Sequence, residues 1–180
     1  IWLNEGFATF YEAVWQEDFY GPAAFDARMR HAQVQVFGWL SGREDHPLLD
    51  PPPPLLFSSL EYYKGAWVLR MLRDLMGKPA FNAAITEYLT TYAYGNADTD
   101  DLRRITGRHY GRPLYWYFDQ WLMGTGYPRL SYVPVFSPSG DGWTAQIAVQ
   151  QTQSTTIFRF PLEIRITTTA GDTLVSAWIE

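Results

Sequence analysis

The sequence contains no cysteine, no long apolar run and no excess of positive charge. Without cysteine, disulfide scaffolds, cysteine nucleophiles and cysteine-ligated zinc or iron–sulfur sites are excluded. No stretch approaches the roughly 18 consecutive apolar residues of a membrane-spanning helix, so we expect no membrane partner. The net charge is −5 and no basic stripe occurs, which argues against a nucleic-acid partner.

Two kinds of catalytic signature are also missing. There is no Gly-x-Ser-x-Gly elbow, and no serine or acidic partner is evident for the three histidines. We therefore predict that His31, His46 and His109 are surface or capping residues. The glycines of residues 124–126 follow a predicted helix and precede a strand, which is the wrong order for a dinucleotide site.

What is present indicates a soluble globular protein. With 180 residues, 47% of them apolar and 18% charged, the chain is large enough for one cored domain or a small domain with an appendage. The composition suits either the cytoplasm or a secreted compartment. Because the sequence opens at Ile1 and closes at Glu180 within a strand-like pattern, we expect it to be a piece of a longer chain.

The sequence up to about Gly126 has helical periodicity. Asn4 is predicted to cap a first helix that ends at Gly21-Pro22. Further helices are expected over residues 24–40, 58–77 and 79–95, and two shorter ones from residue 98 or 99 and from residue 113. Residues 41–54, with Gly42, Pro47 and the prolines of 51–54, predict a stiff surface loop between the second and third helices.

After Pro128 apolar and polar residues alternate. Strands are expected over residues 143–149 and 158–166 and from residue 174, with turns at 137–142 and 170–172. They predict an antiparallel meander with one wet face. The predicted class is therefore α+β, with a helical domain over residues 1–126 and the start of a sheet domain over 127–180.

Two carboxylates on the predicted first helix are candidates for a functional site. Glu5 and Glu12 are seven residues apart, about two helical turns, so both lie on one side of the helix. Such a pair suits a metal ligand and a residue that supports another ligand. However, a glutamate in a first turn also stabilises the helix dipole, and Glu12 can be a solvated surface residue. Since zinc needs about three protein ligands, the residues by themselves favour the structural interpretation.

Three strings resemble one enzyme family. Residues 2–8 (WLNEGFA) resemble the Leu-Asn-Glu-Gly-Phe-Ala signature of the aminopeptidase N and leukotriene hydrolase family of zinc metallopeptidases, the gluzincins. Residues 62–66 (YYKGA) are similar to the family's Tyr-x-Lys-Gly-Ala segment. Residues 118–122 (FDQWL) with 126–128 (GYP) resemble the end of its catalytic domain.

The resemblance implies a zinc aminopeptidase with a peptide as its substrate. Residues 1–126 would be the all-α distal half of a thermolysin-like catalytic domain, and residues 127–180 the first strands of a β-sandwich. By the same resemblance, Glu5 is the third zinc ligand, Glu12 supports a zinc-bound histidine, and Tyr62 rather than Tyr63 stabilises the oxyanion. A phenol, with a reference pKa of about 10, is a hydrogen-bond donor at neutral pH and suits that role.

Two motifs of the family are absent from this sequence. They are the His-Glu-x-x-His that supplies two zinc ligands and the general base, and the Gly-x-Met-Glu-Asn that helps to bind the substrate's amine. We therefore expect the chain to be inactive alone and to depend on the rest of a parent chain. The alternative is a degenerate, non-catalytic peptide-binding module of the same fold. Another is a helical scaffold with a carbohydrate-binding sheet.

Overall fold

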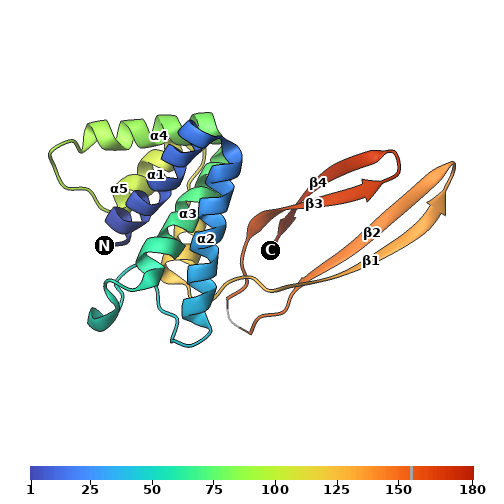
Figure 1. Cartoon of the computed structure of the whole chain (residues 1–180), viewed down its shortest axis with the longest axis horizontal. Coiled ribbons are helices and arrows are strands. Elements are labelled where there is room, and N and C mark those ends of the chain that lie inside the picture. The colour runs from blue at the N-terminus through green and yellow to red at the C-terminus, as the bar shows by residue number, and fades with distance from the viewer. Residues whose placement is uncertain (155) are drawn as a thin grey trace. The chain divides into compact units, whose positions relative to one another are not determined.

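The computed structural model describes residues 1–154 and 156–180. They form two compact units, Ile1–Gly124 and Thr125–Glu180. The first unit is helical and the second is built from antiparallel strands (Figure 1), so the predicted α+β class is confirmed.

Helices follow one another along the helical unit, with no strand between them in the described residues. These are α1 (Trp2–Tyr20), α2 (Pro22–Leu40), η1 (Pro53–Leu55), α3 (Ser59–Met76), α4 (Lys78–Thr91), α5 (Thr99–Tyr110), α6 (Tyr115–Phe118) and η2 (Asp119–Met123). The capping residues explain two of the starts. The Ser58 hydroxyl accepts the Leu60 N–H at 3.1 Å, and Asp98 caps α5 in a reciprocal capping box with Asp101.

Helix α1 begins earlier than the sequence predicts. Its N-cap is Ile1 rather than Asn4. The reason is tertiary, because Trp2 is only 3% exposed and its indole N–H donates to the Thr99 hydroxyl of α5 at 3.0 Å. Burial of this large ring brings residues 2–4 into the helix and leaves Asn4 exposed inside it.

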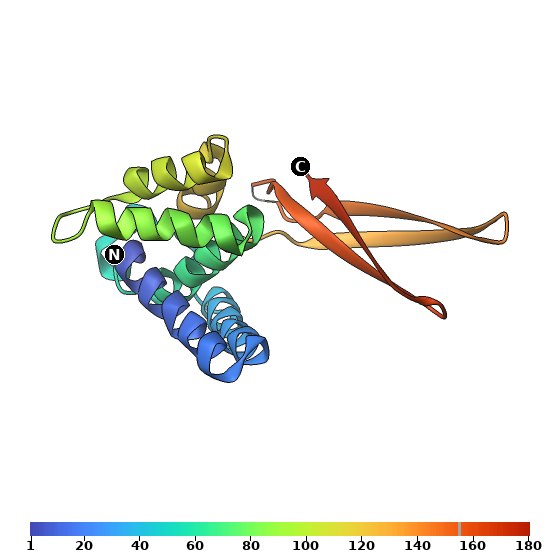
Figure 2. The ribbon, with the colours of Figure 1, turned by 90° about the horizontal axis from the view of Figure 1, so that it is seen from above.

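The core of the unit lies between the helices. Each pair among α1, α2 and α3 is in contact, α4 packs on α3, and α5 packs on α4 (Figure 2). Large apolar side chains fill the space between them and are almost fully buried: Phe10, Phe25, Met29, Leu60, Leu69, Leu72, Phe81, Ile85, Leu102 and Ile105. Such a core fixes the relative positions of helices to within the tolerance of side-chain packing.

Helices α1 and α3 meet backbone to backbone at two glycines. A Cβ atom on Gly6 would lie 2.9 Å from the Gly65 carbonyl carbon, and one on Gly65 would lie 3.0 Å from the Gly6 Cα. Neither neighbour is a flexible side chain that could move aside, so only glycine fits at either position. This contact sets how closely the two helices approach.

The second unit consists of two separate hairpins. Strand β1 (Leu130–Ser139) pairs with β2 (Gly142–Gln151), and β3 (Phe160–Thr168) pairs with β4 (Gly171–Ile179). The predicted turns contain or adjoin the reversals at residues 140–141 and 169–170, but their bounds are wrong, because 137–139, 142 and 171–172 belong to strands. The predicted meander is wrong, because in the described residues β2 and β3 belong to different two-stranded sheets. The alternation in β3 is confirmed, with Leu162, Ile164 and Ile166 half-buried between exposed neighbours.

Candidate functional site

Glu5 lies in the first turn of α1 and is half-buried. Its backbone N–H donates to the Ile1 carbonyl at 3.1 Å. Its carboxylate takes part in no hydrogen bond or ion pair with any residue that the structure describes. The negative charge at this helix start is therefore free to bind a cation.

Tyr62 and Tyr63 lie next to each other on α3 but have different surroundings. The Tyr63 ring faces α2, where its centroid is 6.1 Å from that of His31 and 5.9 Å from the Arg28 guanidinium carbon. Tyr62 is half-buried, and neither its ring nor its hydroxyl has such a partner among residues 1–154 and 156–180. The two tyrosines thus differ in their ring contacts, because the Tyr63 ring is engaged with α2 and the Tyr62 ring is not.

The glycine contact brings the segments that carry Glu5 and Tyr62 together. Glu5 directly precedes Gly6, and Tyr62 lies one helical turn before Gly65 on the same side of α3. The Trp2 carbonyl oxygen is 3.5 Å from the position of a Cβ on Gly65, so the start of α1 lies against this turn of α3. A carboxylate and a phenol 57 positions apart in sequence are therefore carried on adjoining helical turns.

Glu12 is engaged in an ion pair. Its two carboxylate oxygens accept from Nε and Nη2 of Arg28 on α2, at 2.9 and 2.7 Å. The hydrogen bonds from Arg28 lower the pKa of Glu12 although partial burial opposes them. Glu12 is thus held ionised, in the form that accepts an N–H. Its predicted support of a zinc-bound histidine stays a prediction.

The described residues lack a complete set of zinc ligands. Catalytic zinc takes three protein ligands, and no group of three or more His, Asp or Glu side chains within residues 1–154 and 156–180 is arranged to hold a metal. Glu5 fits as one such ligand because its carboxylate is unpaired. Within residues 1–154 and 156–180, Glu5 therefore accounts for only one of the three ligands.

The comparison with known proteins identifies the family. Residues 1–121 match the Peptidase family M1 domain. The chain belongs to peptidase family M1. The resemblance to aminopeptidase N-like zinc peptidases is thereby confirmed, and the family is an enzyme family.

Relatives and solved structures agree with the M1 assignment. The chain is 31% identical to aminopeptidase M1-C of Oryza sativa subsp. japonica over 73% of the chain and 16% of that protein. It is 33% identical to tricorn protease-interacting factor F2 of Thermoplasma volcanium over 72% of the chain and 17% of that protein. The chain thus spans about a sixth of the length of these curated relatives.

Two solved structures share the fold. A variant of the M1 zinc metallopeptidase from Deinococcus radiodurans bound to a Tyr-Ser-Ala substrate superposes with a TM-score of 0.59, at 26% identity, over 71% of the chain and 28% of that structure. Legionella pneumophila aminopeptidase A in complex with aspartic acid superposes with a TM-score of 0.64 over 98% of the chain and 20% of that structure. At 18% identity, the second likeness concerns the fold alone.

The M1 chain also contains a buried polar cluster that the sequence analysis missed. The prediction for His46 is wrong, because its side chain is only 3% exposed and its Nε2 lies 3.1 Å from the Ser58 hydroxyl and 3.5 Å from Glu61 Oε1. This is not a serine-hydrolase triad, since serine and acid approach the same ring nitrogen and the Ser58 hydroxyl already caps α3. Helical spacing could have revealed Glu61, which shares a stripe with Gly65, Leu69 and Leu72.

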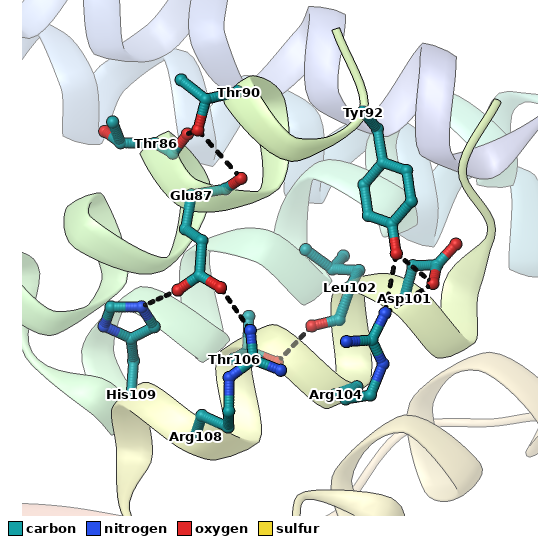
Figure 3. A network of polar contacts seen from close by, with 10 residues as sticks. All are labelled: Thr86, Glu87, Thr90, Tyr92, Asp101, Leu102, Arg104, Thr106, Arg108 and His109. Atoms are coloured by element: carbon teal, nitrogen blue, oxygen red, sulfur yellow. Dashed lines mark hydrogen bonds and ion pairs between the residues drawn. The ribbon is translucent and has the colours of Figure 1, made fainter. Parts of the chain in front are cut away.

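A second polar network of the M1 chain joins α4 to α5 at the surface (Figure 3). Glu87 accepts from His109 Nε2 at 2.7 Å and from Arg108, and these contacts lower the pKa of its carboxyl. Farther along α5, Asp101 accepts from Tyr92 and from Arg104. His109 is therefore a pairing residue between helices, whereas the exposed His31 is at the surface as predicted.

The same α5 borders an open hollow of about 800 Å³ that is rich in arginine. Three of its four arginines already have carboxylate partners: Arg103 pairs with Asp100 at 2.6 Å, Arg104 with Asp101 at 2.9 Å, and Arg108 with Glu87. Exposed pairs of this kind contribute little free energy and serve mainly to order the surface. The paired arginines of the hollow are therefore less available to bind a ligand than the unpaired groups at the α1–α3 crossing.

No helix within the described residues is long and apolar enough to cross a membrane.

Proposed function

We propose that the protein containing this chain is a zinc aminopeptidase that hydrolyses peptides from their amino end. The chain contributes Glu5 as one zinc ligand and Tyr62 as the donor that stabilises the oxyanion. The proposal rests on the α1–α3 crossing. There, the half-buried side chains of Glu5 and Tyr62, which have no polar partner in the described residues, lie on adjoining helical turns. The substrate class is supported by relatives named aminopeptidases and by a structural relative bound to a tripeptide.

Each chain residue has a distinct task in this proposal. Zinc, when bound, supplies Lewis-acid chemistry at the scissile carbonyl. The unpaired Glu5 carboxylate would be one ligand of the metal, and the ionised Glu12 would accept an N–H from a histidine ligand outside this chain and so orient it. The Tyr62 hydroxyl donates to the carbonyl oxygen as that oxygen gains negative charge.

The proposal extends to the two parts of the chain. Residues 1–126 are the distal part of the catalytic domain, and residues 127–180 begin a β-sandwich. The 180-residue chain is inactive alone because Glu5 is a single ligand where three are needed. The remaining ligands and the peptide-binding walls come from the rest of the parent chain.

Turnover by the full-length protein tests the proposal. The variant Tyr62→Phe removes one oxyanion donor and should lower kcat about 100- to 1,000-fold, with zinc content and thermal stability unchanged. The matched control is Tyr63→Phe, which alters the neighbouring tyrosine and should retain kcat within about twofold. Equal turnover of the two variants would remove Tyr62 from the mechanism. Zinc-loaded wild-type protein that binds peptides without cleaving them would favour the non-catalytic module.

A further inference from the structure

Glu61, the residue directly before Tyr62, is a buried acid without a hydrogen-bond partner. Its exposure is 0%, and neither carboxyl oxygen forms a hydrogen bond with the described part of the chain. The nearest polar atom that the structure gives it is Nε2 of His46, at 3.5 Å. Its carboxyl is thus buried beside His46 and makes no hydrogen bond with the described residues.

Glu61 belongs to a cluster that connects three segments. His46 comes from the loop before α3, and its Nε2 also contacts the Ser58 hydroxyl that caps the helix. Lys64, one turn farther along α3 and 7% exposed, donates to the Gly124 carbonyl at 3.4 Å and lies 3.9 Å from Asp45. The loop, the first turn of α3 and the residue after η2 are therefore joined around one buried acid.

The burial of Glu61 is unfavourable for folding. Desolvation raises the pKa of its carboxyl to about 7, although Lys64 acts in the opposite direction. An apolar side chain of similar size would fill the same space without an unpartnered polar group. Residues that break a local rule in this way are expected at functional sites, where stability is sacrificed for geometry.

The helical geometry relates the cluster to the proposed catalytic tyrosine. Successive residues of a helix are about 100° apart, so Glu61 lies about 40° to one side of Gly65 and Tyr62 about 60° to the other. Lys64 lies on the same side as Glu61. The polar cluster therefore holds one side of this turn while the Tyr62 side chain projects from the other, with the Gly6–Gly65 contact between them.

We infer that Glu61 is a positioning residue, which acts through His46 and Lys64 to fix the first turn of α3 and thereby the direction of the Tyr62 hydroxyl. The inference rests on the proposed function, since it assumes that Tyr62 donates to the substrate. A hydroxyl displaced by about 1 Å still allows substrate to bind but loses much of its effect on the transition state. The predicted signature is therefore a loss in kcat without a change in KM.

The full-length enzyme with Glu61→Leu tests the inference. We expect kcat to fall about tenfold with KM within about twofold, while the melting temperature stays equal or rises. Glu61→Gln restores a polar group and should recover most of the loss. In a Tyr62→Phe background, Glu61→Leu should cause no further loss, because the group that it positions is gone. Thr106→Val is the control for changing a buried polar side chain elsewhere, and it should keep wild-type kcat.

Three results would overturn the inference. The first two are wild-type kcat in Glu61→Leu and a change confined to KM. The third is a double variant whose loss in kcat equals the product of the losses in Glu61→Leu and Tyr62→Phe, because independent effects multiply. If Glu61→Leu does not fold, His46→Phe disrupts the cluster from the loop side and is judged by the same criteria. Failure of the proposed function has another signature. It is wild-type turnover in Tyr62→Phe, whatever the Glu61 variants do.

Discussion

The two units of the chain differ in how much of their own apolar surface they cover. In the helical unit, the rings of Phe10 and Phe81 lie at the centre of a closed core. In the hairpins, large residues such as Tyr132, Phe136 and Trp143 are more than half exposed. The half-buried positions there are alternate ones late in β2 and along β3, and Ile179 at the end of β4. A two-stranded hairpin is at best marginally stable by itself, whereas a packed helical group has its own core.

Because of this difference, the helical unit is better able than the hairpins to keep site residues in fixed positions. The proposed site residues and the Glu61 cluster all lie in the unit with the closed core, where side-chain packing limits movement. The hairpins have neither a closed core nor any of these residues. The energetic effects of substitutions should therefore be large at the α1–α3 crossing and small on the hairpins.

The largest effect is expected from filling the glycine contact. Gly6→Val places side-chain carbons where the Gly65 backbone already lies within 3 Å of a Cβ position. Overpacking against the backbone should lower the free energy of unfolding by about 3 kcal/mol, the upper part of the usual range. Urea denaturation of the 180-residue chain measures this, with Gly38→Val as the control because a Cβ there meets nothing within 4 Å. Equal losses in both variants would contradict the role of the crossing.

A smaller effect, with a defined sign, is expected from pH. Because the pKa of Glu61 is about 7 in the folded chain and 4.5 as reference, the folded state binds more protons between these values. Its contribution to stability is therefore present below about pH 4.5 and is lost as the pH rises through 7, by about 2 kcal/mol between pH 5 and 8. His46 works in the opposite direction, since burial lowers its pKa and stability falls as the pH drops below its reference value of 6.5.

The two contributions are separated by comparing wild type with Glu61→Leu at both pH values. The variant should gain about 2 kcal/mol relative to wild type on going from pH 5 to pH 8, as measured by urea denaturation. A stability difference that does not depend on pH would mean that Glu61 titrates normally, and it would weaken the case that its carboxyl is desolvated.

The smallest effect is expected on the hairpins. Trp143 is 72% exposed near the end of the β1–β2 hairpin. Trp143→Ser should change the free energy of unfolding of the helical unit by less than about 0.5 kcal/mol. Far-UV circular dichroism at the helical minimum during urea denaturation monitors this unit. A loss comparable to that of Gly6→Val would show that the helices depend on the hairpin.

The sequence predicts local structure where the signal is itself local. Ser58, Gly77 and Asp98 mark helix ends through capping and backbone chemistry, and the structure has α3 and α5 at those bounds. The start of α1 was misplaced because Trp2 joins the helix through a contact with Thr99 nearly a hundred residues away. The prediction of a meander is wrong for a related reason. Turn residues indicate which strands form a hairpin, but they do not indicate whether two hairpins join in one sheet.

In the candidate site, too, some features have a local sequence signal and others depend on contacts between distant segments. Short strings predict Glu5 and Tyr62 as site residues, whereas helical periodicity alone does not indicate the glycine contact that brings their helical turns together. His46 was misjudged because its partners, Ser58 and Glu61, come close only when the proline-containing loop folds back on α3. Buried polar clusters built from a loop and a helix have no simple sequence period.

The most direct test of the account is the zinc content of the full-length protein with Glu5→Gln, measured beside Asp18→Asn. Both variants neutralise a carboxylate on α1 with little change in shape, but only Glu5 is carried at the crossing with α3. We expect zinc affinity to fall more than about 100-fold in Glu5→Gln and to stay at the wild-type value in Asp18→Asn. Stoichiometric, tightly bound zinc in Glu5→Gln would contradict the proposal that this carboxylate is a metal ligand.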